Sequence, residues 1–245
     1  MRKISTLFLL VILFDLSANS QTKRSSFKEF EIGGEGGLTM DYLTIRDPGD
    51  NLRRSHFQES GMGGPKIRQY IDTNFFLEAA FLWKENVFGF VFKQESGTWH
   101  TNGSKIFIIP LRVGYHWYVS NKVSVNVLAG IVPTFVTLSI QGSGGYGGIT
   151  GGNNDIIYYD YSARDEYKKF YLTVQPGISV SHLIKKKFKF AIGVNYYHGF
   201  IDVELRDVTY RINNGPVQHA VVANRGSFTC YTAAVTYRFD LRKKI

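Results

Sequence analysis

The sequence contains a single cysteine, Cys230, in 245 residues. One cysteine cannot build a disulfide framework or a cysteine-based zinc site, so the fold depends on neither. Charged residues are also few, at 20%, whereas 44% of the residues are hydrophobic, which is too apolar for a disordered chain. The length suits one domain with a sizeable buried apolar surface. We expect Cys230 to be a small inward-facing filler in that domain.

A second absence is an apolar run long enough for a transmembrane helix. The best candidate, residues 123–140, is interrupted by Ser124, Asn126 and Pro133. The interruptions follow a period of two, because the odd-numbered positions from 123 to 135 are apolar and most positions between them are small or polar. This alternation is typical of a β-strand with one apolar face.

The first residues have the pattern of a secretory signal. Arg2 and Lys3 precede eight consecutive apolar residues, and a small-residue cleavage signal follows at 18–20. Eight apolar residues are too few to span a bilayer. We interpret residues 1–20 as a signal peptide and residues 21–245 as one mature domain.

The alternation of apolar with small or polar residues recurs along the mature chain and predicts eight strands. The predicted strands are 30–42, 71–83, 88–92, 106–118, 123–135, 170–183, 188–201 and 227–239.

The predicted connections alternate between long and short. They run 46–69, 84–86, 94–104, 120–122, 141–169, 184–187 and 203–226. A soluble sandwich has no reason to keep every second connection short, whereas outer-membrane barrels have short periplasmic turns and long outer loops. The two faces of the predicted strands also favour a barrel. Large apolar residues alternate with Gly, Ala, Ser, Thr and a few charges, and these smaller residues suit a narrow barrel interior. We predict an all-β fold: an eight-stranded, antiparallel, up-and-down transmembrane β-barrel with both mature termini on the periplasmic side.

Aromatic and basic residues are predicted to mark the membrane surface. Five aromatics fall at predicted strand ends, where a girdle facing the periplasmic interface is expected: Trp83, Trp117, Tyr118, Tyr237 and Phe239. The net charge of +9 has many of its cations beside short connections or the C-terminus, where they would face lipid headgroups. These cations are Lys84, Lys122, Lys185, Lys186, Lys187, Arg242, Lys243 and Lys244. We therefore expect membrane lipid as a partner and no nucleic acid.

Three short segments carry a family resemblance. They are Ile108-Ile109-Pro110-Leu111, Val127-Leu128-Ala129-Gly130 and Tyr237-Arg238-Phe239. With the strand pattern, they resemble the small outer-membrane β-barrel proteins of Gram-negative bacteria, especially the PorT-like barrels. The resemblance implies that Tyr237-Arg238-Phe239 is the aromatic signal read by the barrel-insertion machinery, although six residues follow Phe239. It also implies an accessory role in protein secretion or envelope assembly.

Charged residues on the predicted inner face are the first candidate site. Alternation points eight titratable residues inward: Glu31, Glu35, Glu78, Lys93, Arg112, His116, Lys189 and Arg238. A lone charge in a lumen is costly, so we expect ion pairs, with Glu35, Glu78 and Arg112 meeting across it. A conducting polar pore is the alternative, although eight strands leave little room for one.

The longest predicted connection, 141–169, is the second candidate site. It carries five tyrosines among Gly, Asn, Asp and Ser: Tyr146, Tyr158, Tyr159, Tyr161 and Tyr167. This composition resembles recognition loops, in which Tyr supplies contact area and small residues adapt. The alternatives are an unselected flexible loop, or a hairpin in which residues 156–161 extend the barrel wall.

No segment predicts a catalytic, metal or cofactor site. The glycines at 33–37 lie within a strand and precede no helix, and those at 142–152 lack the end of a phosphate-binding loop. Some barrels are proteases or acyltransferases built on loops, but no nucleophile stands out here. We therefore expect a non-enzymatic protein whose outer loops bind a protein or glycan partner, with the secretion role and a small diffusion pore as alternatives.

Overall fold

The computed structural model describes residues 29–54, 59–93, 99–138, 144–150, 155–164, 167–185 and 187–240. The signal-peptide prediction and the cations Lys186 and Arg242–Lys244 lie outside the described residues. The described part is built from strands, and it holds no helix long and apolar enough to cross a membrane. The strands are β1 (Glu29–Arg46), β2 (Leu52–Arg54), β3 (Glu59–Tyr70), β4 (Phe75–Ala80), β5 (Leu82–Phe92), β6 (Trp99–Ile108), β7 (Leu111–Tyr118), β8 (Val123–Leu138), β9 (Gly144–Thr150), β10 (Ile156–Ala163), β11 (Phe170–Ile184), β12 (Phe188–Gly199), β13 (Glu204–Ile212) and β14 (Gln218–Asp240).

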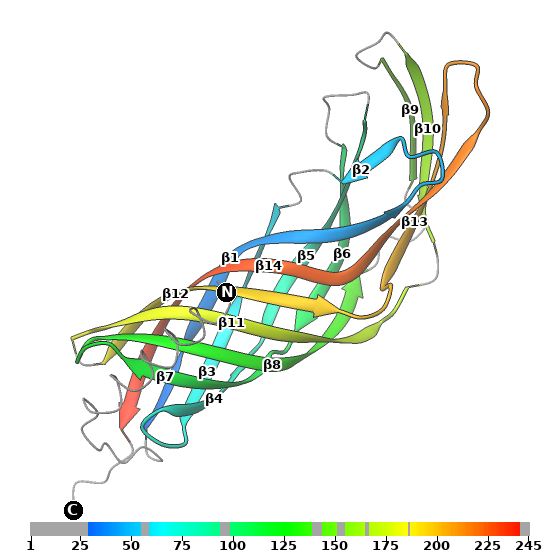
Figure 1. Ribbon diagram of the computed structural model, residues 1–245. Helices are drawn as coiled ribbons and strands as arrows, with labels where there is room; N and C mark the ends of the chain where they lie inside the picture. Colours follow the sequence, from blue (N-terminus) through cyan, green and yellow to red (C-terminus); the bar gives the residue numbers. More distant parts are fainter. Residues whose placement is uncertain are drawn as a thin grey trace, which may run out of the picture.

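The strands close into an antiparallel ring of eight (Figure 1). Its order is β1, β3, β4 with β5, β6 with β7, β8, β11, β12 and β14, and β14 pairs with β1 to close it. Two ring strands carry two labels because each is briefly interrupted. Pro110, which has no N–H to donate, separates β6 from β7, and Phe81 separates β4 from β5. The predicted fold class, an eight-stranded antiparallel barrel, is confirmed.

Two of the predicted strand boundaries are wrong. Residues 75–92 form one ring strand (β4 with β5), with no turn at 84–86, and residues 71–74 of the predicted strand 71–83 are a tight connection instead. Residues 59–70, which we expected in a long connection, form the ring strand β3. The outward positions of β3 include Gly61, Gly63 and Pro65, so this strand shows little apolar alternation. The two errors offset each other in the strand count.

The barrel has two different ends, which we call the turn end and the loop end. At the turn end, three short connections (71–74, 119–122 and 185–187) join neighbouring ring strands. Polar side chains shape two of them: the Asp72 carboxylate accepts hydrogen bonds from the amides of Asn74 and Phe75, each at 2.7 Å, and Ser120 Oγ accepts one from Val123 N at 3.1 Å. The loop end carries the four longer connections, and the predicted alternation of connection length is therefore present.

The outer wall carries a belt of exposed, large apolar side chains along every ring strand. On β12 the belt runs from Phe188 to Tyr196, a distance of about 26 Å along the strand at about 3.3 Å per residue. A strand tilted by about 40° crosses an apolar layer of roughly 20 Å over that distance. The inner face of the same strands is buried, so the wall is apolar outside and filled inside.

Beyond the belt, the wall continues as a two-sided extension at the loop end. There β2, β5 and β6 lie on one side, and β1, β14, β13, β10 and β9 lie on the other, projecting past the ring (Figure 1). Their inward side chains form an apolar cluster that we call the loop-end core: Leu43, Leu52, Phe88, Phe90, Phe92, Ile157, Tyr159, Val208, Tyr210, Ala220 and Val222. We expected the inner face to be small and polar along its full height, and this expectation is wrong at the loop end.

Candidate functional site

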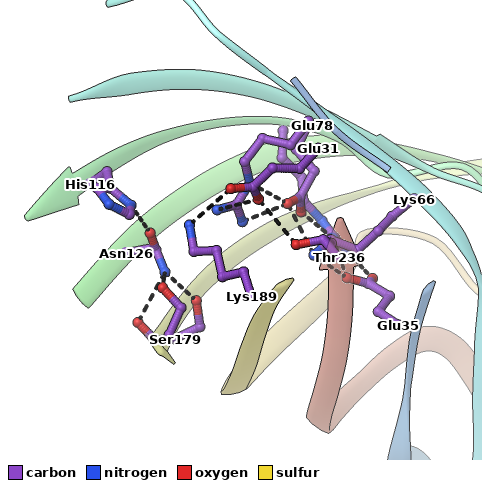
Figure 2. A network of polar contacts seen from close by, with 12 residues as sticks. Glu31, Glu35, Lys66, Glu78, His116, Asn126, Ser179, Lys189 and Thr236 are labelled. Atoms are coloured by element: carbon purple, nitrogen blue, oxygen red, sulfur yellow. Dashed lines mark hydrogen bonds and ion pairs between the residues drawn. The ribbon is translucent and has the colours of Figure 1, made fainter. Parts of the chain in front are cut away.

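The inner face near the turn end gathers eight charged side chains, which we call the lumen cluster. Its members are Glu31, Glu35, Lys66, Arg68, Glu78, Arg112, Lys189 and Arg238, contributed by β1, β3, β4, β7, β12 and β14. Figure 2 shows the labelled members pointing toward one another from these strands. Alternation places each of them inward, because the outward neighbours on the same strands are the apolar residues of the belt.

Arg112 is the centre of the lumen cluster. Its Nη1 donates to Glu78 Oε1 at 2.7 Å, and its Nη2 donates to Glu35 Oε1 at 2.7 Å. The remaining donors reach Gln175 Oε1 at 2.9 Å and the Tyr197 hydroxyl at 3.2 Å. A guanidinium has five N–H donors in a fixed fork, so one arginine can hold two carboxylates on different strands. The predicted meeting of Glu35, Glu78 and Arg112 is present in the structure.

Two cations from β3 complete the pairing of these carboxylates. Arg68 donates to Glu78 Oε2 from both Nε (2.8 Å) and Nη2 (2.6 Å). Lys66 Nζ lies 3.1 Å from Glu35 Oε2 and 3.1 Å from Glu78 Oε2. Lys66 and Arg68 were not among the predicted site residues, because residues 46–69 were expected to form a loop. The period-two spacing of Lys66, Arg68 and Tyr70 is the signal that could have identified β3.

A second centre, Glu31, lies closer to the turn end. Glu31 accepts a hydrogen bond from the Tyr70 hydroxyl at 2.7 Å, and its carboxylate lies 3.4 Å from Lys189 Nζ. Arg238 Nη2 is 3.5 Å away, and Thr236 Oγ1 donates to Glu31 Oε2 at 3.3 Å. Glu31 lies on β1, while Thr236 and Arg238 lie on β14, so these contacts cross the seam that closes the ring.

The lumen cluster fills the barrel at this level. It contains five cations and three carboxylates, all of them buried or nearly so. The cavity beside Glu35, Arg112 and Asn195 measures about 20 Å³, which is room for about one water molecule. The arrangement can hold the strands in register, and the cavity beside Arg112 is too small for a solute larger than water.

Two sequence-based placements are wrong, and a third residue lies inside as predicted but without the expected ion pair. Lys93 lies at the loop end, where it forms an exposed ion pair with Asp50. His116 is buried inside, but its Nδ1 is hydrogen-bonded to Asn126 rather than ion-paired. Lys84, expected at the periplasmic rim, is fully buried in the lumen and lies 2.7 Å from Asp41. Lys84 was misplaced because the turn predicted at 84–86 does not exist.

Asp41 and Lys84 belong to a second buried network nearer the loop end. Lys84 Nζ also donates to Asn86 Oδ1 at 3.1 Å, and Asn86 Nδ2 donates to Ser104 Oγ at 2.9 Å. Ser104 Oγ donates to Glu204 Oε2 at 2.9 Å. This chain of contacts joins β1, β5 and β6 to β13, so the loop-end extension is tied to the ring from inside.

The five tyrosines of the predicted recognition loop have different positions. The structure contains the hairpin alternative, since β9 pairs with β10 and β10 pairs with β13. Tyr158 is exposed on the outside of β10, under the guanidinium of Arg211. Tyr159 is wrongly assigned to the recognition surface, because it is buried in the loop-end core. Tyr161 and Tyr167 are half-buried, and Tyr146 lies on β9 opposite Asp160.

The five aromatics predicted to form the periplasmic girdle do not all lie at the turn end. Trp117, Tyr237 and Phe239 lie on the outer wall at the turn end, where Tyr237 packs against Phe188 of β12 with ring centroids 5.1 Å apart. Tyr118 faces inward instead and packs on the His116 ring at 4.4 Å. Trp83 is exposed on the outer wall but lies at the loop-end edge of the belt, so its assignment to the turn end is wrong. Among the described residues, no group of His, Cys, Asp and Glu side chains is placed to hold a metal ion.

Comparison with known proteins gives a family and a fold. Residues 19–204 match the family described as outer membrane protein beta-barrel domain. The outer membrane protein OprG from Pseudomonas aeruginosa is similar in structure, with a TM-score of 0.50 and 10% identity over 90% of this chain and 100% of that chain. The N-terminal β-barrel domain of P. aeruginosa OprF gives a TM-score of 0.45 and 11% identity, covering 87% of this chain and 99% of its own. No curated protein matches the sequence.

Proposed function

Because this chain belongs to the outer membrane protein beta-barrel family, we propose that it is a non-enzymatic integral membrane protein whose loop-end extension binds a protein or glycan outside the cell. The observation that carries the proposal is the loop-end extension itself. A barrel needs only its belt to span a membrane, yet β2, β9, β10 and β13 add a structured body beyond the belt. In this reading the loop end faces outward and both mature termini face the periplasm.

The interior supports a binding role over a pore. The lumen cluster fills the turn-end half of the barrel, buried side chains such as Leu82, Phe228 and Lys84 fill the rest of the ring, and the loop-end core lies beyond it. A diffusing solute would have to separate buried ion pairs and then cross packed aromatic rings. Breaking one buried ion pair costs about 3–5 kcal/mol, so passive flow through this interior is disfavoured.

Anchored connections make the extension a rigid platform. The Asp47 carboxylate accepts hydrogen bonds from the amides of Asn51 and Leu52, each at 2.7 Å, and from the Tyr210 hydroxyl at 2.8 Å. These bonds fasten the connection before β2 to β13 on the opposite side. On the outside, Arg164 holds Asp207 through two hydrogen bonds of 2.7 Å. Preorganised loops lose less entropy on binding, which favours recognition.

The outer faces of β10 and β13 offer the contact groups for a partner. Tyr158 and Arg211 are exposed neighbours in the strand pairing, with the Arg211 guanidinium 5.3 Å from the Tyr158 ring centroid. Asp160 lies on the same face as Tyr158, and His219 Nδ1 is 3.2 Å from Thr209 Oγ1 on the adjoining strands. Tyrosine and arginine are the residue types that most often dominate binding energy at interfaces.

A binding screen tests the proposal. The mature protein in phospholipid nanodiscs would be applied to a glycan array and to an array of extracellular host proteins. We expect binding to one class, and at least a tenfold loss of affinity in the double variant Tyr158→Ala/Arg211→Ala. Arg53→Ala, which removes an exposed arginine from β2, should bind like the wild type. Equal binding by all three proteins would show that this face is not the contact surface.

A deletion strain separates the binding role from the secretion role. If the protein is an accessory of protein secretion, cells lacking it should lose secreted cargo, and Tyr158→Ala/Arg211→Ala should restore the cargo as well as the wild type does. If it is a surface binder, the secreted proteins should be unchanged and only adhesion to the ligand found on the arrays should fall. Lost cargo with unchanged adhesion would overturn the proposal.

A further inference from the structure

The outer wall of the belt has a pronounced hollow, which we call the wall groove. It measures about 640 Å³ and lies across β1, β14, β12 and β11, lined mainly by Gly36, Leu38, Ile178, Ile192, Tyr231 and Ala233. The strand pairing explains its shape, because Ala233 lies between Gly36 on one side and Ile192 on the other. Two small residues side by side form the floor, and larger apolar side chains form the rim. Volumes of about 300–1,000 Å³ are typical of small-molecule sites.

The small floor is only partly imposed by packing within the wall. A Cβ at the outward-facing Gly34 would meet its nearest atom at an ordinary 3.5 Å, and one at Gly36 would lie 3.3 Å from the Met62 backbone oxygen, so a side chain there needs only a small shift of the wall. The inward-facing Gly33 and Gly37 differ, since a Cβ there would lie 1.9 Å and 2.1 Å from backbone oxygens. Glycine within a strand costs roughly 0.5–1 kcal/mol relative to alanine. Packing at Gly36 is far less restrictive than at Gly33 and Gly37, so the wall itself accounts for only part of this cost, which points to a use for the hollow.

A band of polar aromatic side chains borders the wall groove toward the loop end. The Tyr42 hydroxyl is 2.9 Å from Thr229 Oγ1, and the Tyr42 and Tyr196 ring centroids are 6.1 Å apart. The Tyr196 hydroxyl is 3.3 Å from His198 Nδ1. These residues lie further along β1, β14 and β12, the strands that form the groove. Such side chains are typical of the level at which hydrocarbon meets lipid headgroups.

Two arginines lie beyond this band on the same side of the barrel. Arg46 of β1 and Arg225 of β14 both contact Asp202, the latter through Nε at 3.0 Å. Partial burial raises the pKa of Asp202, but hydrogen bonds from Arg225 and Arg46 outweigh that effect, so its pKa lies below the usual value. The group therefore carries a net charge of +1 at neutral pH. Two guanidiniums hold more N–H donors than one carboxylate can accept, which leaves donors facing solvent.

We propose that the wall groove, the tyrosine band and the arginine pair together bind one membrane lipid with an anionic, phosphate-bearing headgroup. One acyl chain would lie in the groove, the glycerol or sugar region against Tyr42 and Tyr196, and the phosphate against Arg46 and Arg225. The spacing fits a lipid: Gly36 and Tyr42 are six residues apart on β1, or about 20 Å along the tilted strand. Guanidinium is well matched to phosphate in charge and geometry.

A second copy of this chain fits the surface less well. A twofold contact would place the same patch on both partners, so two groups of charge +1 would face each other. The groove would also face a groove, leaving its hollow unfilled. The hydrocarbon chains that surround the belt can fill it without either cost.

Native mass spectrometry of the mature protein tests the proposal. The protein would be reconstituted in vesicles of phosphatidylcholine with an equal share of phosphatidylglycerol, extracted into mild detergent, and examined for retained lipid. We expect one phosphatidylglycerol per protein, retained in preference to phosphatidylcholine. Ala233→Leu, which fills the groove, and Arg46→Gln/Arg225→Gln, which removes the cations, should each reduce retention at least fivefold.

Matched controls isolate the two parts of the site. Ala129→Leu adds the same bulk to an exposed outer-wall position on β8, away from the groove, and Arg164→Gln removes an exposed, ion-paired arginine away from the band. Both controls should retain lipid like the wild type. Retention of phosphatidylglycerol that is unchanged in all four variants, or equal retention of both lipids by the wild type, would overturn the proposal. All variants should show the same heat-dependent gel mobility, which reports a closed barrel.

Discussion

Arg112 shows why the lumen cluster has to be complete. Each of its two carboxylate partners has another cation close by, so every charge in the cluster is shared between at least two strands. Removing one member of a buried ion pair costs more than the pair contributes, because the remaining charge stays desolvated. The cluster is therefore sensitive to single changes and more tolerant of balanced ones.

We expect Arg112→Met to destabilise the barrel by about 3–5 kcal/mol in denaturant, and less if water enters the site. Adding Glu78→Gln should recover part of this loss, since it removes one of the carboxylates left short of a cation. Unfolding in urea with a double-mutant cycle measures the coupling. Strictly additive losses would show that Arg112 and Glu78 do not interact. An open channel would instead show altered ion selectivity at nearly unchanged stability.

Gly114 faces the lumen at a position with no free space. A Cβ there would lie 2.1 Å from the ring of Phe76, which is fully buried and packs under the Arg68 guanidinium. We expect Gly114→Ala to destabilise the barrel by about 1–3 kcal/mol through overpacking. The double variant Gly114→Ala/Phe76→Leu should be more stable than the sum of the two single losses predicts. Urea unfolding of the four proteins measures this, and wild-type stability of Gly114→Ala would contradict the observed packing.

At the scale of single residues, period-two alternation predicted the correct face of the charged residues on the recognised strands within the belt, but not at 88–92, where Phe88 and Phe92 face inward. Glu35, Glu78 and Arg112 face inward, as alternation predicts. Alternation gives no information on which inward charges meet, and the partners Lys66 and Arg68 come from a strand whose outward positions include glycine and proline. Pairing across a ring depends on strand order, which the sequence pattern does not contain.

The strands change their apolar face where they leave the belt. On β4 and β5 the outward residues are apolar from Phe75 to Trp83, and the inward residues become apolar at Phe88, Phe90 and Phe92. The strand does not flip; its surroundings change from lipid outside to a packed core inside. The expectation that every apolar face meets lipid is therefore wrong at the loop end, and it explains why one strand was predicted as two and Lys93 was predicted to point inward.

The loop-end core should behave as a separate stability unit. Phe92 is fully buried and packs against Tyr210 and Tyr159, with ring centroids 5.3 Å and 6.0 Å away. We expect Phe92→Ala to cost about 3–5 kcal/mol, felt mainly in the extension. Hydrogen exchange should accelerate in β10 and β13 while β11 and β12 stay protected. Phe200→Ala, at an exposed site, should leave both regions unchanged. Uniform acceleration around the ring would mean that ring and extension unfold together.

At the scale of the whole molecule, the alternation of connection lengths predicted the barrel even though two strand boundaries were wrong. The pattern survives because it depends on where chain reversals are tight, and residues such as Asp72 and Ser120 shape those turns locally. The loop-end extension could not be predicted as a folded body. Its core unites residues from six strands, and each of them contributes only a few apolar side chains.

Because its interior is filled, the barrel is predicted not to conduct ions. In planar bilayers we expect the purified protein to give no unitary conductance above that of a protein-free membrane, because buried side chains fill both halves of the lumen. The same sample should migrate differently on a detergent gel before and after heating, which verifies that it is folded. Stable conductance steps from a heat-modifiable sample would contradict the description of the interior.

The Glu31 contacts across the β1–β14 seam have a consequence for assembly. The pairing runs without interruption from Glu29 opposite Asp240 to Asp41 opposite Phe228, so the seam has no bulge over this stretch that would fix its alignment. A shift of one residue would turn Glu31 and Glu35 toward hydrocarbon, and a shift of two would separate Glu31 from Thr236 and Arg238. The carboxylates thus act as a check on ring closure: a misaligned barrel would leave a desolvated charge unsatisfied, and only the correct alignment would be stable enough to persist in the membrane.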